Sequence, residues 1–240
     1  MCYNIQVLEK KAEKMASRYK ALFPQGDLFH AVYHASAFQH PLLPVVTTEF
    51  PSTIKLFSWG LIPYWIKSKE EALKIRDMTA NCVGETAFSK PSFRHVITKK
   101  RCLVPVTGYF EWHTEGRSKY PFYIYLKDKE IFSLAGIFDN WTDKETGEIV
   151  DTFSIITTHA NPMLEKIHNL KKRMPVILKR EDEERWIDPK ITKEEVNQLI
   201  KPFDESLMTA HSISKLITSR TQSNNVPEVM EPFEYPELKL

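Results

Sequence analysis

The sequence predicts a single mixed α+β domain. Its 240 residues suffice for one large domain or two small ones, and no internal repeat, low-complexity linker or Pro/Gly-rich break divides them. Segments with the composition of β-strands run through the middle of the chain, and short segments with helical spacing lie around them. The 42% of hydrophobic and 27% of charged residues are ordinary for a globular protein. We therefore assign residues 1–240 to one domain with an irregular tail from about residue 226.

The individual elements follow from apolar spacing and from turn residues. Helices are expected where apolar residues recur at helical spacing, and strands where β-branched and aromatic runs are bounded by Pro, Gly, Asn or Asp. The predicted helices span 8–19, 88–99, a short segment ending at 168, 181–187 and 191–200, and 67–76 is expected to be a surface helix or loop. The predicted strands span 43–48, 53–59, 101–113 with breaks at Pro105 and Gly108, 120–126, 131–138, 151–158, a segment ending at 178, and one strand or a pair over 207–218.

Composition limits the class of function. The net charge of +2 does not by itself indicate a nucleic-acid binder, so an anion site has to come from local clustering of cations. There is no run of about 18 apolar residues, and residues 9–14 are rich in Lys and Glu, so we expect neither a membrane span nor a secretory signal. The three widely spaced cysteines, Cys2, Cys82 and Cys102, give no disulfide framework and no metal-ligand pair. A cytoplasmic protein without metal or cofactor is expected.

Cys2 has the chemistry of a nucleophile at a chain end. Initiator methionine is usually removed when a small side chain follows it, and removal would leave a free α-amine and a thiol on Cys2. The amine can condense with an aldehyde to a Schiff base, and the thiol can then close on the imine carbon to give a five-membered thiazolidine. The thiolate population depends on the local pKa of the thiol. The alternative is that Cys2 is only the second residue of a disordered end.

Two further polar residues stand in unusual surroundings. Glu111 lies between Phe110 and Trp112 in a predicted strand, where alternation either points it to solvent or buries it. A buried carboxyl would have a raised pKa suited to proton transfer. Asn81 lies in a loop-like stretch close to Gly84, where it either serves a turn or presents its amide to a sugar or phosphate oxygen.

Cations and aromatic residues cluster at three other places. His168 precedes the basic run Lys171–Arg173, and a histidine beside three cations is a candidate for acid–base work at an anion site, although a lone histidine is more often structural. The block Ser58–Trp65 is either a hydrophobic corner or a platform for stacking bases, worth roughly 1–3 kcal/mol per base. The cluster Lys99–Arg101 is interpreted as solvated surface.

Nine short motifs occur in order along the chain. They are Met1-Cys2, Ser58-Trp-Gly-Leu-Ile-Pro63, Asn81 with Glu85-Thr86, Arg101-Cys-Leu-Val-Pro105, Gly108-Tyr-Phe-Glu-Trp112, Thr157-Thr-His-Ala-Asn161, Ile167-His168, Arg173-Met-Pro-Val176 and Arg185-Trp-Ile-Asp-Pro189. Together they resemble the SOS response-associated peptidase (SRAP) family of abasic-site processing proteins, from residue 2 to about residue 230. The resemblance implies a mainly antiparallel, barrel-like β core flanked by short helices.

Proteins of this family crosslink to abasic sites in single-stranded DNA. The resemblance implies that Cys2, once Met1 is removed, forms a thiazolidine with the aldehyde of the ring-opened sugar, and that lyase-like and self-processing activities accompany this reaction. It implies that Asn81 holds the sugar or its phosphate, that Glu111 lies beside the Cys2 amine and that His168 handles protons. DNA contacts are expected from Trp59, Pro63, Trp65, Thr157, Lys171, Lys172 and Arg173. We expect a monomer whose partner is single-stranded DNA with abasic sites, associated with the nucleoid during DNA damage.

Three departures from the family pattern concern cations. The family commonly reads Cys-Gly-Arg at the start, where this chain has Cys2-Tyr3-Asn4, and Asn-Ala-Arg where this chain has Asn81-Cys82-Val83. The family's His and Arg are commonly separated by one residue, whereas the extra residues Leu170–Lys172 intervene here. The added lysines are candidates to replace the missing arginines. The departures leave the chemistry of Cys2 intact and concern DNA affinity and path.

Two other functions fit the same residues. A cysteine peptidase or amidohydrolase with Cys2 as N-terminal nucleophile would use Glu111 and His168 equally well. A non-catalytic single-stranded DNA-binding module would use the aromatic residues and lysines, and it would not need Cys2. Incubation with abasic single-stranded DNA, intact DNA and peptides separates the three functions.

Overall fold

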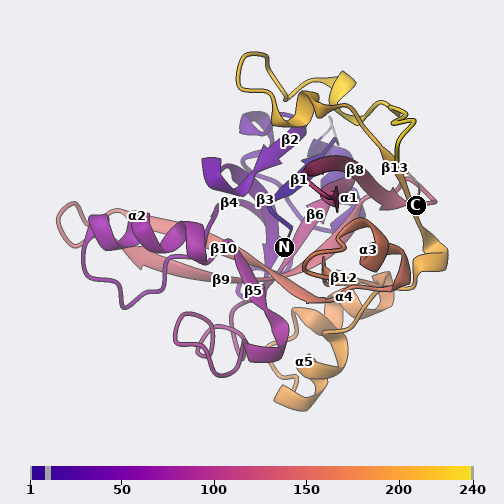
Figure 1. The fold of residues 1–240 in the computed structure, drawn as a ribbon. Helices are drawn as coiled ribbons and strands as arrows, with labels where there is room; N and C mark the ends of the chain where they lie inside the picture. The colour runs from indigo at the N-terminus through magenta and orange to yellow at the C-terminus, as the bar shows by residue number, and fades with distance from the viewer. Residues whose placement is uncertain (1, 9–11, 239–240) are drawn as a thin grey trace.

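A closed ring of five strands forms the centre of the computed structural model, which describes residues 2–8 and 12–238 (Figure 1). The strands are hydrogen-bonded in the order β10–β4–β3–β6–β9, and pairing of β9 with β10 closes the ring. All neighbours are antiparallel except β4 and β10. The bounds are β3 (Leu42–Thr47), β4 (Ile54–Trp59), β6 (Arg101–Val106), β9 (Phe132–Thr142) and β10 (Ile149–His159). Closure leaves no free edge within the ring.

The C-terminal half of β10 extends the ring and holds two further strands. Ile155–Thr157 pairs in parallel with β5 (Asn81–Val83), and Thr157–His159 pairs antiparallel with β11 (Arg173–Pro175). The short β12 (Ile177–Leu178) pairs with β9 on the other side. Two segments far apart in the sequence are thereby held on the two sides of one strand.

A second, fully antiparallel sheet packs beside the ring. Its strand order is β13–β8–β7–β1–β2, with bounds β13 (Met208–Ser212), β8 (Ser118–Leu126), β7 (Gly108–Glu115), β1 (Asn4–Val7) and β2 (Val32–Ser36). The chain passes from ring to sheet at Thr107, between β6 and β7, and the Thr107 amide donates to the Gln6 carbonyl oxygen. One apolar cluster joins both layers, because Tyr109 and Ile124 of the sheet pack with ring residues such as Val104.

Short helices surround the two β layers. They are α1 (Ala12–Tyr19), α2 (Lys69–Met78), α3 (Pro162–Ile167), α4 (Arg180–Trp186) and α5 (Lys193–Leu199). In Figure 1, α2 lies alongside the far ends of β9 and β10, where Ala72 packs with Trp141. Side-chain caps begin several helices, including Asn161 at α3 and the Thr192–Glu195 capping box at α5. Within the described residues, no helix combines the length and the apolar character needed to cross a bilayer.

The predicted fold class, an α+β fold with a mainly antiparallel, barrel-like core and short helices, is confirmed. The central strands lie within a few residues of the predicted ranges, and α1 lies within the predicted 8–19, although residues 9–11 are outside the described part. The break predicted at Pro105 is wrong, because β6 continues through it to Val106. Pro105 is tolerated because β3 pairs with β6 only at Cys102 and Leu103, so it removes no hydrogen bond from that pair.

Three other sequence predictions differ from the structure. Residues 88–99 form successive turns rather than a regular helix, since Pro91 lacks an N–H and the Ser89 and Thr98 hydroxyls donate to local carbonyl oxygens. Beyond β13 the chain turns into a 3-10 helix, Lys215–Thr218, capped by the Ser214 hydroxyl. The expected irregular tail includes another 3-10 helix, Pro227–Met230.

Arg101 also departs from the predicted solvated cluster, because it is completely buried at the start of β6. Its guanidinium donates to four backbone carbonyl oxygens at 2.6–3.0 Å, those of Trp186, Ile97, Thr98 and Asp188. Burial lowers the pKa of this guanidinium. The single side chain thus ties a ring strand to the turns before it and to the end of α4.

We predict that Arg101→Met destabilises the fold by about 3–5 kcal/mol, because it leaves buried carbonyl oxygens without a donor. Urea unfolding followed by circular dichroism measures this change. The matched control is Arg94→Met, at an exposed position of the same turns, which should change the free energy of unfolding by less than about 0.5 kcal/mol. Equal stability of the two variants would contradict the structural role given to Arg101.

Candidate active site

Cys2 lies buried where β1 begins. β1 runs antiparallel to β7 with Ile5 opposite Tyr109, so the chain before β1 continues alongside the part of β7 that carries Glu111. Cys2 is completely buried, and its Sγ lies 3.9 Å from the Asn4 carbonyl oxygen. Burial raises the pKa of the thiol well above its ordinary value, and the negative charge of Glu111 raises it further. A disordered end therefore does not describe Cys2. Met1, whose removal is predicted, lies outside the described residues.

Glu111 points into the protein rather than to solvent. Its residue is 3% exposed, and burial raises the pKa of its carboxyl to about 7. Among the described residues Oε1 has no hydrogen-bond partner, and Oε2 lies 3.7 Å from His168 Nε2. A carboxyl with this pKa is present in both protonation states near neutral pH, which suits it to general acid–base work.

His168 follows the last residue of α3 and is also buried. Its Nδ1 lies 2.9 Å from the Arg173 carbonyl oxygen, and because a carbonyl only accepts, Nδ1 carries the proton. In the neutral ring, Nε2 is then a proton acceptor on the side of Glu111. Burial lowers the pKa of His168 and favours this neutral form. The site therefore combines a buried thiol, a carboxyl that titrates near pH 7 and a neutral imidazole.

The segment inserted between His168 and Arg173 forms a turn against β7. The Lys172 amide donates to the His168 carbonyl oxygen at 2.8 Å, and Lys172 adopts a left-handed backbone conformation with φ of 49°. The Asn169 side chain accepts from the Thr114 amide and donates to the Thr114 carbonyl oxygen, at 3.0 and 2.8 Å. Lys171 and Lys172 are exposed at the tip of this turn. The extra residues are thus anchored, and they place two lysines beside the buried histidine.

Arg173 begins β11 opposite His159 of β10. Its guanidinium donates to both oxygens of Glu85, at 2.8 and 2.7 Å, and to the Thr157 carbonyl oxygen at 2.8 Å. Thr157 itself is completely buried, so the expected direct contact of Thr157 with DNA does not fit its position. Thr157 instead positions the guanidinium of Arg173.

The buried side chains of Asn81 and Tyr109 carry polar atoms that have no hydrogen-bond partner among the described residues. The side-chain amide of Asn81 on β5 is 5% exposed, and neither its Oδ1 nor its Nδ2 is paired. The Tyr109 hydroxyl, two positions before Glu111 on the same strand face, is unpaired as well. Unpaired buried groups cost roughly 1–3 kcal/mol each and are rare. Asn81 was predicted as a site residue, whereas nothing in the sequence distinguished Tyr109 from an ordinary core tyrosine.

The predicted aromatic platform divides into buried and exposed parts. Trp59 is completely buried, stacks on Phe153 with ring centroids 6.1 Å apart, and donates from Nε1 to the Ala80 carbonyl oxygen. It therefore has no ring face to offer a base, and its predicted direct contact with DNA does not fit this burial. Pro63 is buried as well. Tyr64 and Trp65 are 58% and 43% exposed, so these two rings form the accessible part of the block.

Asn4 makes a side-chain contact within the second sheet. Its Oδ1 lies 2.8 Å from His34 Nε2, across the pairing of β1 with β2. Sequence reasoning also missed Glu85 as the ion-pair partner of Arg173, since the two are 88 positions apart. In the described part of the chain, no group of three or more His, Cys, Asp or Glu side chains is arranged to hold a metal ion.

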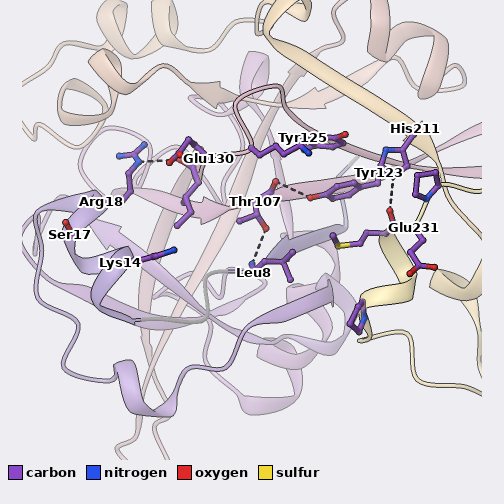
Figure 2. A pocket seen from close by; sticks show the side chains of 15 residues that line it. Leu8, Lys14, Ser17, Arg18, Thr107, Tyr123, Tyr125, Glu130, His211 and Glu231 are labelled. Atoms are coloured by element: carbon purple, nitrogen blue, oxygen red, sulfur yellow. Dashed lines mark hydrogen bonds between the residues drawn. The ribbon is translucent and has the colours of Figure 1, made fainter.

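A cavity of about 960 Å³ lies elsewhere on the protein, and none of the predicted site residues lines it. Figure 2 shows Lys14 and Arg18 of α1 on one side, and Tyr123 and His211 of the second sheet on the other. His211 Nε2 is hydrogen-bonded to the Met230 carbonyl oxygen, and the Tyr123 hydroxyl donates a hydrogen bond to Gln6 Oε1. The buried reactive groups around Cys2, rather than this cavity, therefore define the candidate active site.

The fold combines a closed five-stranded ring and a second antiparallel sheet with a buried thiol, carboxyl and imidazole. The family model described as SOS response associated peptidase (SRAP) matches residues 1–220. Abasic site processing protein YoqW of Bacillus subtilis is 35% identical over 210 residues, which are 87% of this chain and 88% of that protein. Abasic site processing protein HMCES of Gallus gallus is 32% identical over 197 residues, covering 73% of this chain and 56% of that protein. The chain belongs to the SOS response-associated peptidase family.

Solved structures share this fold. A protein from Bacteroides thetaiotaomicron is similar with a TM-score of 0.90 and 44% sequence identity, over 97% of this chain and all of that one (100%). A protein from Bordetella bronchiseptica is similar with a TM-score of 0.76 and 20% identity, over 89% of this chain and 100% of that one. The second likeness shows the fold alone.

We predict that Glu111 makes stability depend on pH. The pKa of its carboxyl is about 7 when folded and near 4.5 when exposed, so the unfolded chain loses this proton first as pH rises. The stabilisation that comes from keeping the Glu111 carboxyl protonated in the fold is fully present below pH 4.5 and is lost by about pH 7. The free energy of unfolding should therefore fall by about 3 kcal/mol between these two pH values.

Urea unfolding of the wild type and of Glu111→Gln from pH 4 to pH 8 gives the free energy of unfolding of each protein as a function of pH. The difference between the two curves is the contribution of the Glu111 carboxyl. The control Glu115→Gln, at an exposed position of the same strand, should follow the wild type. A Glu111→Gln curve parallel to the wild type would show that the carboxyl is not perturbed.

Proposed function

We propose that this protein senses abasic sites in single-stranded DNA and forms a thiazolidine crosslink to them through Cys2. The observation that carries the proposal is the complete burial of Cys2 beside a carboxyl with a pKa of about 7 and a neutral histidine. Abasic-site processing is the activity in the names of its relatives YoqW and HMCES. A role in the repair of damaged DNA follows from that proposed chemistry.

The proposed reaction begins after water hydrolyses the Met1–Cys2 bond and frees the Cys2 amine, a step we assign to the protein itself. The amine adds to the C1′ aldehyde of the opened sugar, and loss of one water gives an imine. The thiol sulfur then bonds to the imine carbon, while its proton passes to the nitrogen. Crosslinking thus removes one water in total. The imine also permits β-elimination of the 3′ phosphate, which is the lyase-like side reaction.

The surrounding residues take proton-transfer roles in this proposal. The thiol is protonated at rest, because burial raises its pKa, so its proton needs an acceptor. Glu111 and His168, whose Oε2 and Nε2 lie 3.7 Å apart, would receive this proton and return it to the carbinolamine oxygen that leaves as water. The unpaired amide of Asn81 is a partner for a sugar hydroxyl or phosphate oxygen.

The proposed DNA contacts are electrostatic and stacking contacts. Arg173, with the exposed Lys171 and Lys172, would hold phosphates, and this local cluster fits a protein whose total charge is only +2. Tyr64 and Trp65 offer exposed rings for stacking, whereas Trp59 and Pro63 are buried. The partner is therefore single-stranded DNA, and one copy of the chain contains all of the proposed residues.

We predict that Cys2→Ala abolishes the heat-stable adduct with abasic single-stranded DNA, because an alanine amine forms an imine but cannot close a ring. Borohydride should trap this imine as a stable amine. Cys2→Ser should behave similarly or give a weaker oxazolidine. Denaturing gels with and without borohydride measure both species.

The matched control is Cys102→Ala, which removes another completely buried thiol and should crosslink like the wild type. A heat-stable adduct of Cys2→Ala without borohydride would show that Cys2 is not the crosslinking thiol. Wild-type cleavage of peptides without any reaction with abasic DNA would favour the peptidase function instead.

A further inference from the structure

The candidate phosphate-binding side chain, Arg173, is already occupied by an anion within the protein. Its Nη1 and Nη2 donate to the two carboxylate oxygens of Glu85 at 2.8 and 2.7 Å, a bidentate arrangement. The same two-pronged geometry is the one with which arginine binds a phosphate. The Glu85 carboxylate and two oxygens of a DNA phosphate would therefore compete for the same N–H donors of Arg173.

The other donors of Arg173 do not face solvent. Nη2 also donates to the Thr157 carbonyl oxygen, and Nε is buried with no partner in the described part of the chain. The Arg173 side chain is only 13% exposed, whereas Glu85 is 35% exposed on the outer side of the pair. An approaching phosphate would thus meet Glu85 before it reaches the guanidinium.

Glu85 is fixed in this position and remains charged. It belongs to the 3-10 helix Gly84–Thr86, directly after β5, and His159 Nε2 lies 3.2 Å from its Oε1. Burial alone would raise the pKa of Glu85, but the hydrogen bonds from Arg173 lower it below its ordinary value. Arg173 is the permanently charged partner of this carboxylate, with Nη2 and Oε2 2.7 Å apart.

We propose that Glu85 occupies the phosphate site of Arg173 in the free protein, and that DNA binds by displacing it. The inference rests on the proposed DNA-binding role of Arg173. Glu85 would then weaken binding to every single strand by a fixed factor. DNA strands that also engage the buried site would gain enough binding free energy to offset this loss of affinity. Intact DNA strands would not, and they would dissociate.

The test measures binding of a fluorescent intact single-stranded oligonucleotide, without an abasic site, by anisotropy over a range of salt concentrations. Glu85→Gln should bind roughly threefold to tenfold more tightly than the wild type, since the exposed ion pair no longer competes. Its salt dependence should steepen by about 0.7 in slope, because one more cation is available for phosphate. In an Arg173→Gln background, the gain from Glu85→Gln should disappear.

The matched control is Glu165→Gln, which removes an exposed carboxylate 3.9 Å from Lys172 and should change affinity by less than about twofold. An equal gain in this control would mean that only general charge matters, and would overturn the inference. Weaker or unchanged binding by Glu85→Gln would also overturn it, because Glu85 would then orient Arg173 for DNA.

A second measurement uses the unaltered protein and so does not depend on folding of a variant. The carboxyl carbon of Glu85, followed by NMR, should titrate at higher pH when the oligonucleotide is bound, because Glu85 loses its hydrogen bonds from Arg173. An unchanged titration would contradict displacement. Wild-type protein that crosslinks abasic DNA but fails these tests overturns this inference alone, whereas no binding and no crosslinking overturn the proposed function with it.

Discussion

The antiparallel pairing of β1 with β7 is the contact on which the candidate active site depends. The second residue of a chain is usually exposed and mobile. Here the register of Ile5 opposite Tyr109 draws the chain end along β7, and Cys2 becomes completely buried. Burial raises the pKa values of both Cys2 and Glu111, since each charged form loses its hydration. One strand pairing therefore sets both the position and the protonation state of the reactive groups.

The long strand β10 supplies the second half of the site. Its N-terminal half closes the ring with β9, and its C-terminal half leaves the ring to carry β5 on one side and β11 on the other. Asn81 and Arg173 are held on these two strands, and the Arg173 carbonyl oxygen fixes the ring of His168. His168 Nε2 lies 3.7 Å from Glu111 Oε2, so the five-stranded ring and the second sheet meet at the candidate site.

The sequence was most informative where a local pattern and the tertiary structure agree. The ring strands and the fold class followed from β-branched runs and turn residues, and Cys2, Glu111 and His168 followed from unusual residues in ordered motifs. Burial was harder to predict, since alternation allows either face and the partner strand decides. The cluster Lys99–Arg101 was interpreted as solvated surface and Trp59 was expected to contact DNA, yet Arg101 and Trp59 are both completely buried. The pairing of Glu85 with Arg173 spans 88 positions, so no local pattern contained it.

The central claim is that Cys2, freed of Met1, joins an abasic site through both its amine and its thiol. Intact mass spectrometry of the purified protein, before and after mixing with an abasic single-stranded oligonucleotide, tests this most directly. The account predicts a starting mass that lacks methionine and a heat-stable product equal to protein plus oligonucleotide minus one water, with the adduct mapped to Cys2. Full crosslinking by protein that retains Met1, or an adduct mapped to a lysine, would contradict it.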